Sequence, residues 1–146
     1  MKKINIVCVG KIKDFLLPAI NEYSTRLRKY CSLSVVEIAE AKSECVKKES
    51  EEIMKKLSGF VVLCDLGGEI MTSEAFSEKL DKLFVSHPAI TFVIGGSEGV
   101  SDEVKKRADY KICFGKFTYP HQLMRVILLE QIYRAFGIAN NTPYHK

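Results

Sequence analysis

The stretch Phe114-Gly-Lys-Phe-Thr-Tyr-Pro-His-Gln-Leu-Met-Arg125 marks the point where the chain passes from its last predicted strand to its last predicted helix. The strand, Tyr110–Cys113, is short and apolar, and the residues after the stretch are hydrophobic almost without interruption. Pro120 stands where the helix should begin, a position at which its missing N–H costs nothing. His121 and Arg125 then share one face of that helix. A loop and a helix start carrying two cationic or proton-handling side chains predict a ligand site.

Upstream of this stretch, apolar runs of strand length alternate with helical patterns. Near-continuous apolar runs such as Phe60–Cys64 indicate strands buried on both faces, as in a parallel sheet. The alternation predicts an α/β fold, a mostly parallel sheet flanked by helices on both faces. The predicted strands are Ile4–Val9, Leu33–Ile38, Phe60–Cys64, Ile90–Ile94 and Tyr110–Cys113, and the predicted helices are Phe15–Tyr30, Ser43–Leu57, Ser73–Phe84, Asp102–Arg107 and Pro120–Phe136.

Length and composition predict one soluble domain, residues 1–146, because 47% of the residues are hydrophobic and 27% are charged. No apolar run reaches the roughly 18 residues of a membrane span, and the N-terminus shows no signal peptide. We therefore expect a cytoplasmic protein without membrane association. The net charge of +4 is compatible with a nucleic-acid partner but does not argue for one. The basic run Lys105–Arg107 is either a phosphate-binding patch or a solvated surface.

The cysteines and histidines do not indicate a metal site. The five cysteines are odd in number and include no CxxC pair, so buried, reduced thiols are a simpler interpretation than a disulfide or metal set. The three histidines are not spaced as metal ligands either. We therefore expect no metal. The residues concerned are Cys8, Cys31, Cys45, Cys64, Cys113, His87, His121 and His145.

Three glycine-containing segments follow predicted strands: Asp65–Glu69, Gly95–Gly99 and Phe114–Tyr119. In open α/β sheets ligands bind outside the carboxyl ends of the strands, and glycine lets the backbone approach a ligand closely. As a set, the three segments predict a site for a nucleotide-like molecule held by main-chain groups. The chain lacks the GxGxxG fingerprint and the P-loop motif. Gly10, after the first strand, is interpreted as a turn.

The last predicted helix is apolar almost all round, which indicates deep burial. In so small a domain, we expect one face to pack on the sheet and another on a second subunit. A symmetric dimer is the commonest arrangement. Glu130 and Arg134 are spaced for an i,i+4 ion pair, either within the chain or at that interface.

Four ordered segments carry a more specific resemblance, supported by the opening Val7-Cys-Val-Gly-Lys11. The chain resembles the RlmH family of 23S ribosomal RNA pseudouridine N3-methyltransferases, of the SPOUT class, over its whole length. The resemblance implies homodimers, a deep C-terminal trefoil knot tied by Gly95–Gly99 and Phe114–Pro120, and S-adenosyl-L-methionine as cofactor. The four segments are Phe92-Val-Ile-Gly-Gly-Ser-Glu-Gly99, Thr118-Tyr-Pro-His-Gln-Leu-Met-Arg125, Glu130-Gln-Ile-Tyr-Arg-Ala135 and Pro143-Tyr-His-Lys146.

The resemblance also implies the site and the substrate. The substrate is 23S ribosomal RNA, presented on the large subunit or the assembled ribosome, and Lys105–Arg107 and Lys116 are candidates for phosphate contacts. Cys64, Gly115 and Phe117 depart from the residues common in the family, changes that backbone binding of the adenosine tolerates. The implied cofactor-binding residues are Cys64, Gly95, Phe114, Gly115, Lys116, Phe117, Thr118 and Tyr119.

Chemistry at N3 of a pseudouridine needs a base for the imide proton and a cation for the developing anion. Arg125 suits the second task, and His121 or His145 suits the first. Tyr144 and His145 are expected to close over a flipped base. The alternatives are that His121 only orients the helix start, that Arg125 contacts phosphate or a partner chain, and that residues 144–146 are a frayed tail.

Two other functions remain open on the sequence alone. An NAD-binding α/β enzyme would need a glycine fingerprint, which is absent. A ribosome-associated factor without enzymatic activity would be expected to have degraded cofactor loops, whereas the loops here are intact. A measurement of cofactor binding would distinguish the enzyme from the non-enzymatic factor.

Overall fold

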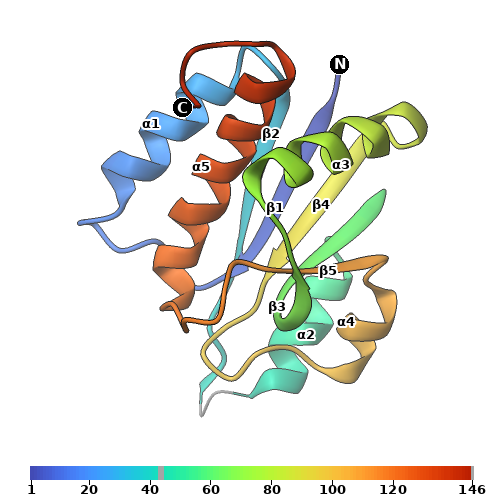
Figure 1. Cartoon of the computed structure of the whole chain (residues 1–146). Coiled ribbons are helices and arrows are strands. Elements are labelled where there is room, and N and C mark those ends of the chain that lie inside the picture. The colour runs from blue at the N-terminus through green and yellow to red at the C-terminus, as the bar shows by residue number, and fades with distance from the viewer. Residues whose placement is uncertain (43–44, 146) are drawn as a thin grey trace.

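The computed structural model describes residues 1–42 and 45–145, in which five parallel strands form one sheet in the order β2-β1-β4-β3-β5 (Figure 1). The predicted α/β fold with a parallel sheet is therefore confirmed. The strands are β1 (Lys3–Val9), β2 (Ser32–Ile38), β3 (Phe60–Ile70), β4 (Ala89–Ile94) and β5 (Tyr110–Cys113). The helices are α1 (Leu17–Leu27), α2 (Val46–Met54), α3 (Ser73–Ser86), α4 (Asp102–Arg107) and α5 (His121–Ala139).

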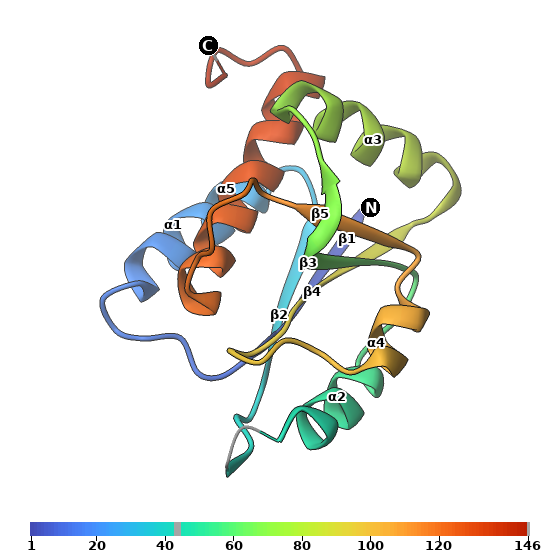
Figure 2. The same ribbon diagram turned by 60° about the horizontal axis from the view of Figure 1, so that its bottom comes forward.

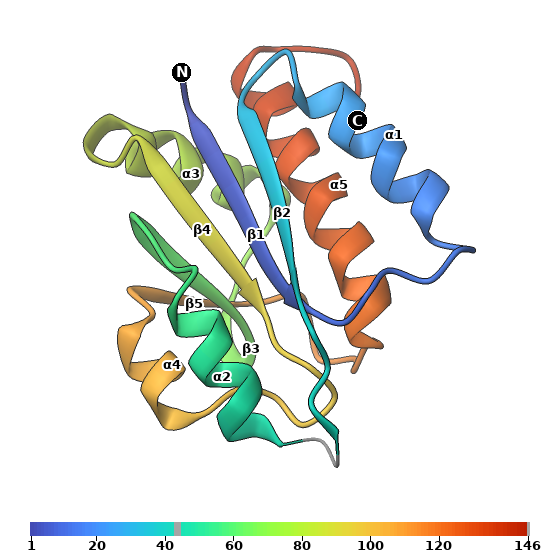
Figure 3. The same ribbon diagram turned by 180° about the vertical axis from the view of Figure 1, so that it is seen from behind.

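Helices cover both faces of the sheet, as Figures 1 and 3 show. Along β1, Ile4 and Ile6 point into a core with α1, α3 and α5, whereas Val7 and Val9 point into a second core with α2 and α4. Because both faces are buried, β1 has apolar residues at successive positions rather than at alternate ones.

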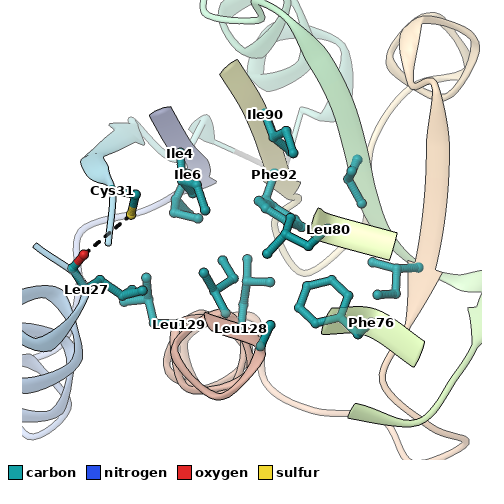
Figure 4. Packing of buried hydrophobic residues seen from close by; sticks show 14 of the residues in the cluster. Ile4, Ile6, Leu27, Cys31, Phe76, Leu80, Ile90, Phe92, Leu128 and Leu129 are labelled. Atoms are coloured by element: carbon teal, nitrogen blue, oxygen red, sulfur yellow. Dashed lines mark hydrogen bonds between the residues drawn. The ribbon is translucent and has the colours of Figure 1, made fainter. Parts of the chain in front are cut away.

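The larger core lies between the sheet and α5 (Figure 4). Cys31 belongs to it, and its thiol donates a hydrogen bond to the Leu27 carbonyl at 3.7 Å. Burial raises the pKa of Cys31, and likewise that of Cys8, to about 11. All five cysteines are free; Cys8, Cys31 and Cys113 are fully buried, whereas Cys45 and Cys64 are partly buried. Residues that meet in this core include Ile4, Ile6, Leu27, Phe76, Leu80, Ile90, Phe92, Leu128 and Leu129.

Helix ends differ from the predicted ones near prolines. Helix α1 begins at Leu17 rather than Phe15, because Pro18 is tolerated only in the first turn of a helix. Pro120 is the N-cap of α5, with an extended backbone (φ −55°, ψ 138°), so the helix starts one residue later than predicted. The predicted start of α2 at Ser43 lies outside the described residues, and the helix begins at Val46.

One predicted loop is wrong. Residues 65–69 belong to β3, which continues to Ile70 after an irregularity and pairs again with β5. Gly68 makes this possible, since a Cβ there would lie 2.6 Å from the backbone carbon of Ile112. This glycine therefore allows two strands to approach closely rather than opening a loop.

Helix α5 is flanked by α1 and α3 on the sheet face that they share (Figure 1). These neighbours cover part of the apolar circumference that we expected a second subunit to cover. Leu123 remains 37% exposed. Within the described part of the chain, no helix combines the length and apolar character needed to cross a bilayer.

Candidate functional site

A cavity of about 270 Å³ opens at the carboxyl edge of the sheet, between the ends of β3, β4 and β5 and the first turn of α5. Its size lies near the lower end of the about 300–1,000 Å³ usual for small-molecule sites. Figure 2 shows the segments after β4 and β5 reaching the end of the sheet where α5 begins. The cavity is lined by Leu63–Leu66, Ile94–Ser97, Gly99, Val100, Ile112–Gly115, Phe117–Tyr119, His121 and Met124.

The first wall is the glycine segment after β4. Gly99 has a left-handed backbone (φ +81°) and donates its N–H to the Gly96 carbonyl at 3.0 Å, which closes a tight turn. A Cβ at Gly95 would lie 2.8 Å from Val100 Cγ1 and 3.0 Å from the carbonyl of Gly99. Any side chain at Gly95 would therefore displace the turn that forms the wall.

Helices α2 and α4 support this wall from behind. Ser101 donates its backbone N–H to Ser50 Oγ of α2 at 2.9 Å. The Ser101 hydroxyl accepts from the Val104 N–H at 3.4 Å, so this serine is the N-cap of α4.

The second wall is the segment after β5. Gly115 again has a left-handed backbone (φ +109°), and its carbonyl accepts a hydrogen bond from the Cys113 thiol at 3.0 Å. Seven of the eight predicted cofactor-binding residues line the cavity; the exception, Lys116, is exposed outside it. The seven are Cys64, Gly95, Phe114, Gly115, Phe117, Thr118 and Tyr119.

The middle of β3 contributes a thiol and a carboxylate, from Cys64 and Asp65, to the cavity. Burial raises the pKa of the Cys64 thiol to about 12, with smaller contributions from Asp65 and Cys113. Asp65 accepts a hydrogen bond from the Gly67 N–H at 3.3 Å. Asp65 belongs to the glycine-containing segment 65–69 that was predicted to help form a ligand site, but no role for its carboxylate was predicted from the sequence.

His121 lies at the floor of the cavity, in the first turn of α5. Its Nε2 is buried and has no hydrogen-bond partner among the described residues. The nearest charge is Glu40 Oε1 at 3.6 Å, on a side chain that is 62% exposed. Buried polar groups are usually hydrogen-bonded in folded proteins, so a ring nitrogen without such a bond on a residue that lines the cavity makes His121 a candidate proton acceptor.

Arg125, one turn further along, lies beneath the cavity rather than on its wall. Its side chain is 1% exposed and pairs with Glu37 Oε2 at 2.7 Å. It also donates to the carbonyls of Val9 (3.2 Å) and Gly10 (2.9 Å). Arg125 therefore ties α5 to the ends of β1 and β2. Gly10, with φ +89°, forms the turn that we predicted.

Tyr144 and His145 lie against the middle and the C-terminal half of α5. The Tyr144 hydroxyl donates to Glu130 Oε2 at 2.8 Å, and His145 contacts Arg134 at 3.0 Å. Burial, Tyr23 and Glu130 together raise the pKa of Tyr144. These bonds do not fit a frayed tail at residues 144–145; Lys146 lies outside the described residues.

The length of α5 separates these residues from the cavity. Glu130 and Arg134, which bind Tyr144 and His145, lie about 14 and 20 Å along the helix from His121 at 1.5 Å per residue, so one chain does not bring the tail side chains to His121. The Glu130–Arg134 ion pair, 2.9 Å long, lies within the chain, which is one of the two places left open by the sequence. No group of three or more His, Cys, Asp or Glu side chains among the described residues could hold a metal ion.

Comparison with known proteins places the chain in a family. Residues 1–145 match the family model described as "Predicted SPOUT methyltransferase". The chain is 48% identical to the ribosomal RNA large subunit methyltransferase H of Clostridium beijerinckii, covering 98% of this chain and 99% of the relative. It is 46% identical to the putative ribosomal RNA large subunit methyltransferase H of Methanococcus maripaludis, with the same coverage.

A solved structure supports the fold alone. The probable methylase family protein from Haemophilus influenzae Rd KW20 superposes with a TM-score of 0.57 at 14% identity, covering 98% of this chain and 70% of that one. The full-length family match and the relatives at 46–48% identity agree with the resemblance seen in the four C-terminal segments. The chain belongs to the SPOUT methyltransferases, in the family of the ribosomal RNA large subunit methyltransferases H.

Proposed function

We propose that the protein transfers the methyl group of S-adenosyl-L-methionine to N3 of a pseudouridine in 23S ribosomal RNA, on the large subunit or the assembled ribosome. The observation that carries the proposal is the cavity lined by His121, whose Nε2 forms no hydrogen bond, and by two glycine-containing walls. Membership of the family supports the reaction class and the RNA substrate.

The cavity fits the cofactor by its shape and chemistry. A turn that excludes any side chain at Gly95 leaves backbone groups to hold an adenosine. Thr118 and Asp65 add polar side chains, and Phe114 and Tyr119 add aromatic ones. We propose that the seven lining residues named above bind the cofactor. Contact of the exposed Lys116 with cofactor or phosphate stays a prediction.

When bound, the cofactor supplies an electrophilic methyl carbon, which bonds to N3 as its bond to sulfur breaks and the electron pair stays on sulfur. The N3 proton must leave in the same reaction. We propose that it passes to Nε2 of His121, which no other described group occupies. Glu40, 3.6 Å away, would stabilise the resulting imidazolium.

Arg125 was expected to stabilise the developing anion directly, and that role stays a prediction. Its burial and its bonds to Glu37, Val9 and Gly10 favour an indirect contribution, in which it holds the first turns of α5 against the sheet. His121 lies four residues before Arg125, so this tie positions the proposed base.

A homodimer would bring the tail to the cavity. If Tyr144 and His145 act on the substrate, we propose that they come from a second chain, because their partners Glu130 and Arg134 lie about 14 and 20 Å along α5 from His121. Apolar side chains are exposed around the cavity mouth, Phe117 at 80% and Leu66 at 67%. Ile70, 54% exposed, lines an adjoining hollow. Such a patch favours contact with another protein surface.

The test uses large ribosomal subunits and ribosomes from cells that lack this methylation, incubated with the protein and isotope-labelled S-adenosyl-L-methionine. We expect the label in one nucleoside, with the mass and chromatographic behaviour of N3-methylpseudouridine. Label in a different nucleoside would refute the substrate assignment. Absence of label on both particles, with the cofactor bound, would refute catalysis on the ribosome.

A further inference from the structure

Residues 10–16, here called the arm, join β1 to α1 beside the first turn of α5 (Figures 1 and 3). The arm therefore lies at the same edge of the sheet as the cavity. Its side chains at Lys11, Lys13 and Phe15 are exposed, and Phe15 is exposed to 78%. Large aromatic side chains are mostly buried in folded proteins, so the exposed ring of Phe15 is a candidate for contact with a binding partner.

Hydrogen bonds fix the backbone of the arm next to the first turn of α5, which carries His121. Gln122, the next residue of α5 and only 7% exposed, donates to the Lys11 carbonyl at 2.8 Å and accepts from the Lys13 N–H at 3.0 Å. The Ile12 N–H donates to Glu37 at 2.7 Å. A pre-organised loop loses little entropy when it binds.

The charges on the arm fit a polyanion. Lys11 and Lys13 form no ion pair within the described part of the chain. The acidic neighbours are Asp14 on the arm, Glu37, whose carboxylate is paired with Arg125, and Glu40, which lies 3.6 Å from His121. Lysines beside an exposed aromatic ring match the chemistry of RNA, in which phosphates alternate with stacking bases. Protein interfaces, by contrast, are depleted in lysine.

We infer that the arm is an RNA-contacting element, in which Phe15 stacks on an unpaired base and Lys11 and Lys13 contact adjacent phosphates. The inference rests on the proposed function and deepens it, because it names a substrate contact next to the proposed base. The lysines are anchored through their backbone groups, so side-chain changes leave the arm in place.

The test compares a Phe15→Ala variant, a Lys11→Gln/Lys13→Gln variant and a matched Lys29→Gln/Lys56→Gln control. Lys29 and Lys56 are exposed and precede β2 and β3, at the opposite edge of the sheet. The readouts are the Kd for unmethylated large ribosomal subunits by filter binding at several salt concentrations, and cofactor affinity by calorimetry.

We expect Phe15→Ala to raise the Kd for subunits by about 5- to 150-fold, the usual effect of losing one stacked base. The arm lysine variant should reduce the slope of log Kd against log salt by about 1.4 to 1.8, as expected for two lost phosphate contacts. The control pair should leave the slope unchanged, and all variants should keep the cofactor affinity of the wild type.

An active wild type whose arm variants match it in Kd and in salt slope would overturn the inference alone. Conversion of a dimer to monomers by Phe15→Ala, measured by sedimentation, would assign the arm to a subunit interface and overturn it as well. A wild type that neither binds the cofactor nor methylates subunits would overturn the proposed function and, with it, this inference.

Discussion

Replacing Arg125 with Met should destabilise the fold far more than an arginine substitution at the surface. Arg125 is 1% exposed and its guanidinium binds Glu37 at 2.7 Å, Gly10 at 2.9 Å and Val9 at 3.2 Å. Met fills a similar volume but removes the guanidinium donor from two carbonyl groups and leaves the Glu37 carboxylate with the Ile12 N–H and no cation. Breaking a buried ion pair from one side costs about 3–5 kcal/mol. Glu37 is 36% exposed and keeps some hydration, so we expect the lower part of that range.

Urea unfolding followed by far-UV circular dichroism measures this loss, since the chain has no tryptophan for fluorescence. With an m-value of about 2 kcal/mol per molar urea, a loss of about 3 kcal/mol moves the midpoint down by about 1.5 M. Arg28→Met is the control: Arg28 is exposed at the end of α1, so its replacement should stay within about 0.5 kcal/mol.

Arg125→Lys separates charge from geometry. A lysine keeps the charge near Glu37 but lacks the planar fork that reaches both carbonyls, so its stability should fall between wild type and Arg125→Met. An Arg125→Met variant that loses less than about 1 kcal/mol would show that the ties to β1 and β2 contribute little, and would refute the positioning role.

Three further predictions concern the proposed base and the thiols. His121→Asn should lower kcat on ribosomal particles by about 100-fold or more while leaving cofactor affinity within twofold, and an unchanged kcat would exclude His121 as the base. Iodoacetamide at pH 8 should label Cys45 before Cys8, Cys31 and Cys64, because burial raises the pKa of those three thiols to about 11, 11 and 12. Peptide mass spectrometry gives the order of labelling, and labelling of Cys31 before Cys45 would contradict this prediction. A thiol whose pKa is raised in the folded state stabilises the fold below its unfolded pKa near 9, so stability should fall as the pH rises from 9 towards 11. The urea midpoint at pH 8 and pH 10.5 measures this fall, which Cys31→Ala should reduce.

Local patterns in the sequence predicted the sheet and most of the cavity. Buried parallel strands have uninterrupted apolar runs, so β1 and β4 could be located from the sequence alone. Because the carboxyl ends of parallel strands meet at one edge, Gly95 and Phe114–Tyr119 could be predicted to lie together.

The features that local sequence patterns did not predict depend on contacts between distant segments. The course of β3 past Cys64 depends on its second pairing with β5, and no local pattern around Gly68 shows that partner. The environment of Arg125 depends on Glu37, 88 residues earlier, and no local pattern predicts the buried ion pair between them, while the catalytic role expected for Arg125 stays a prediction. The prediction that Tyr144 and His145 act beside His121 concerns a second chain, which the folding of one chain does not test.

Calorimetric titration of the protein with S-adenosyl-L-methionine tests the central claim most directly, with NAD and a Gly95→Val variant as controls. We predict saturable binding of one cofactor per chain, no binding of NAD, and loss of cofactor binding in Gly95→Val, whose side chain would collide with Val100 and Gly99. Unaltered circular dichroism of the variant would show that the fold persists. Absence of binding at millimolar cofactor, binding of NAD instead, or undiminished binding by Gly95→Val would contradict the assignment of this cavity to the methyl donor.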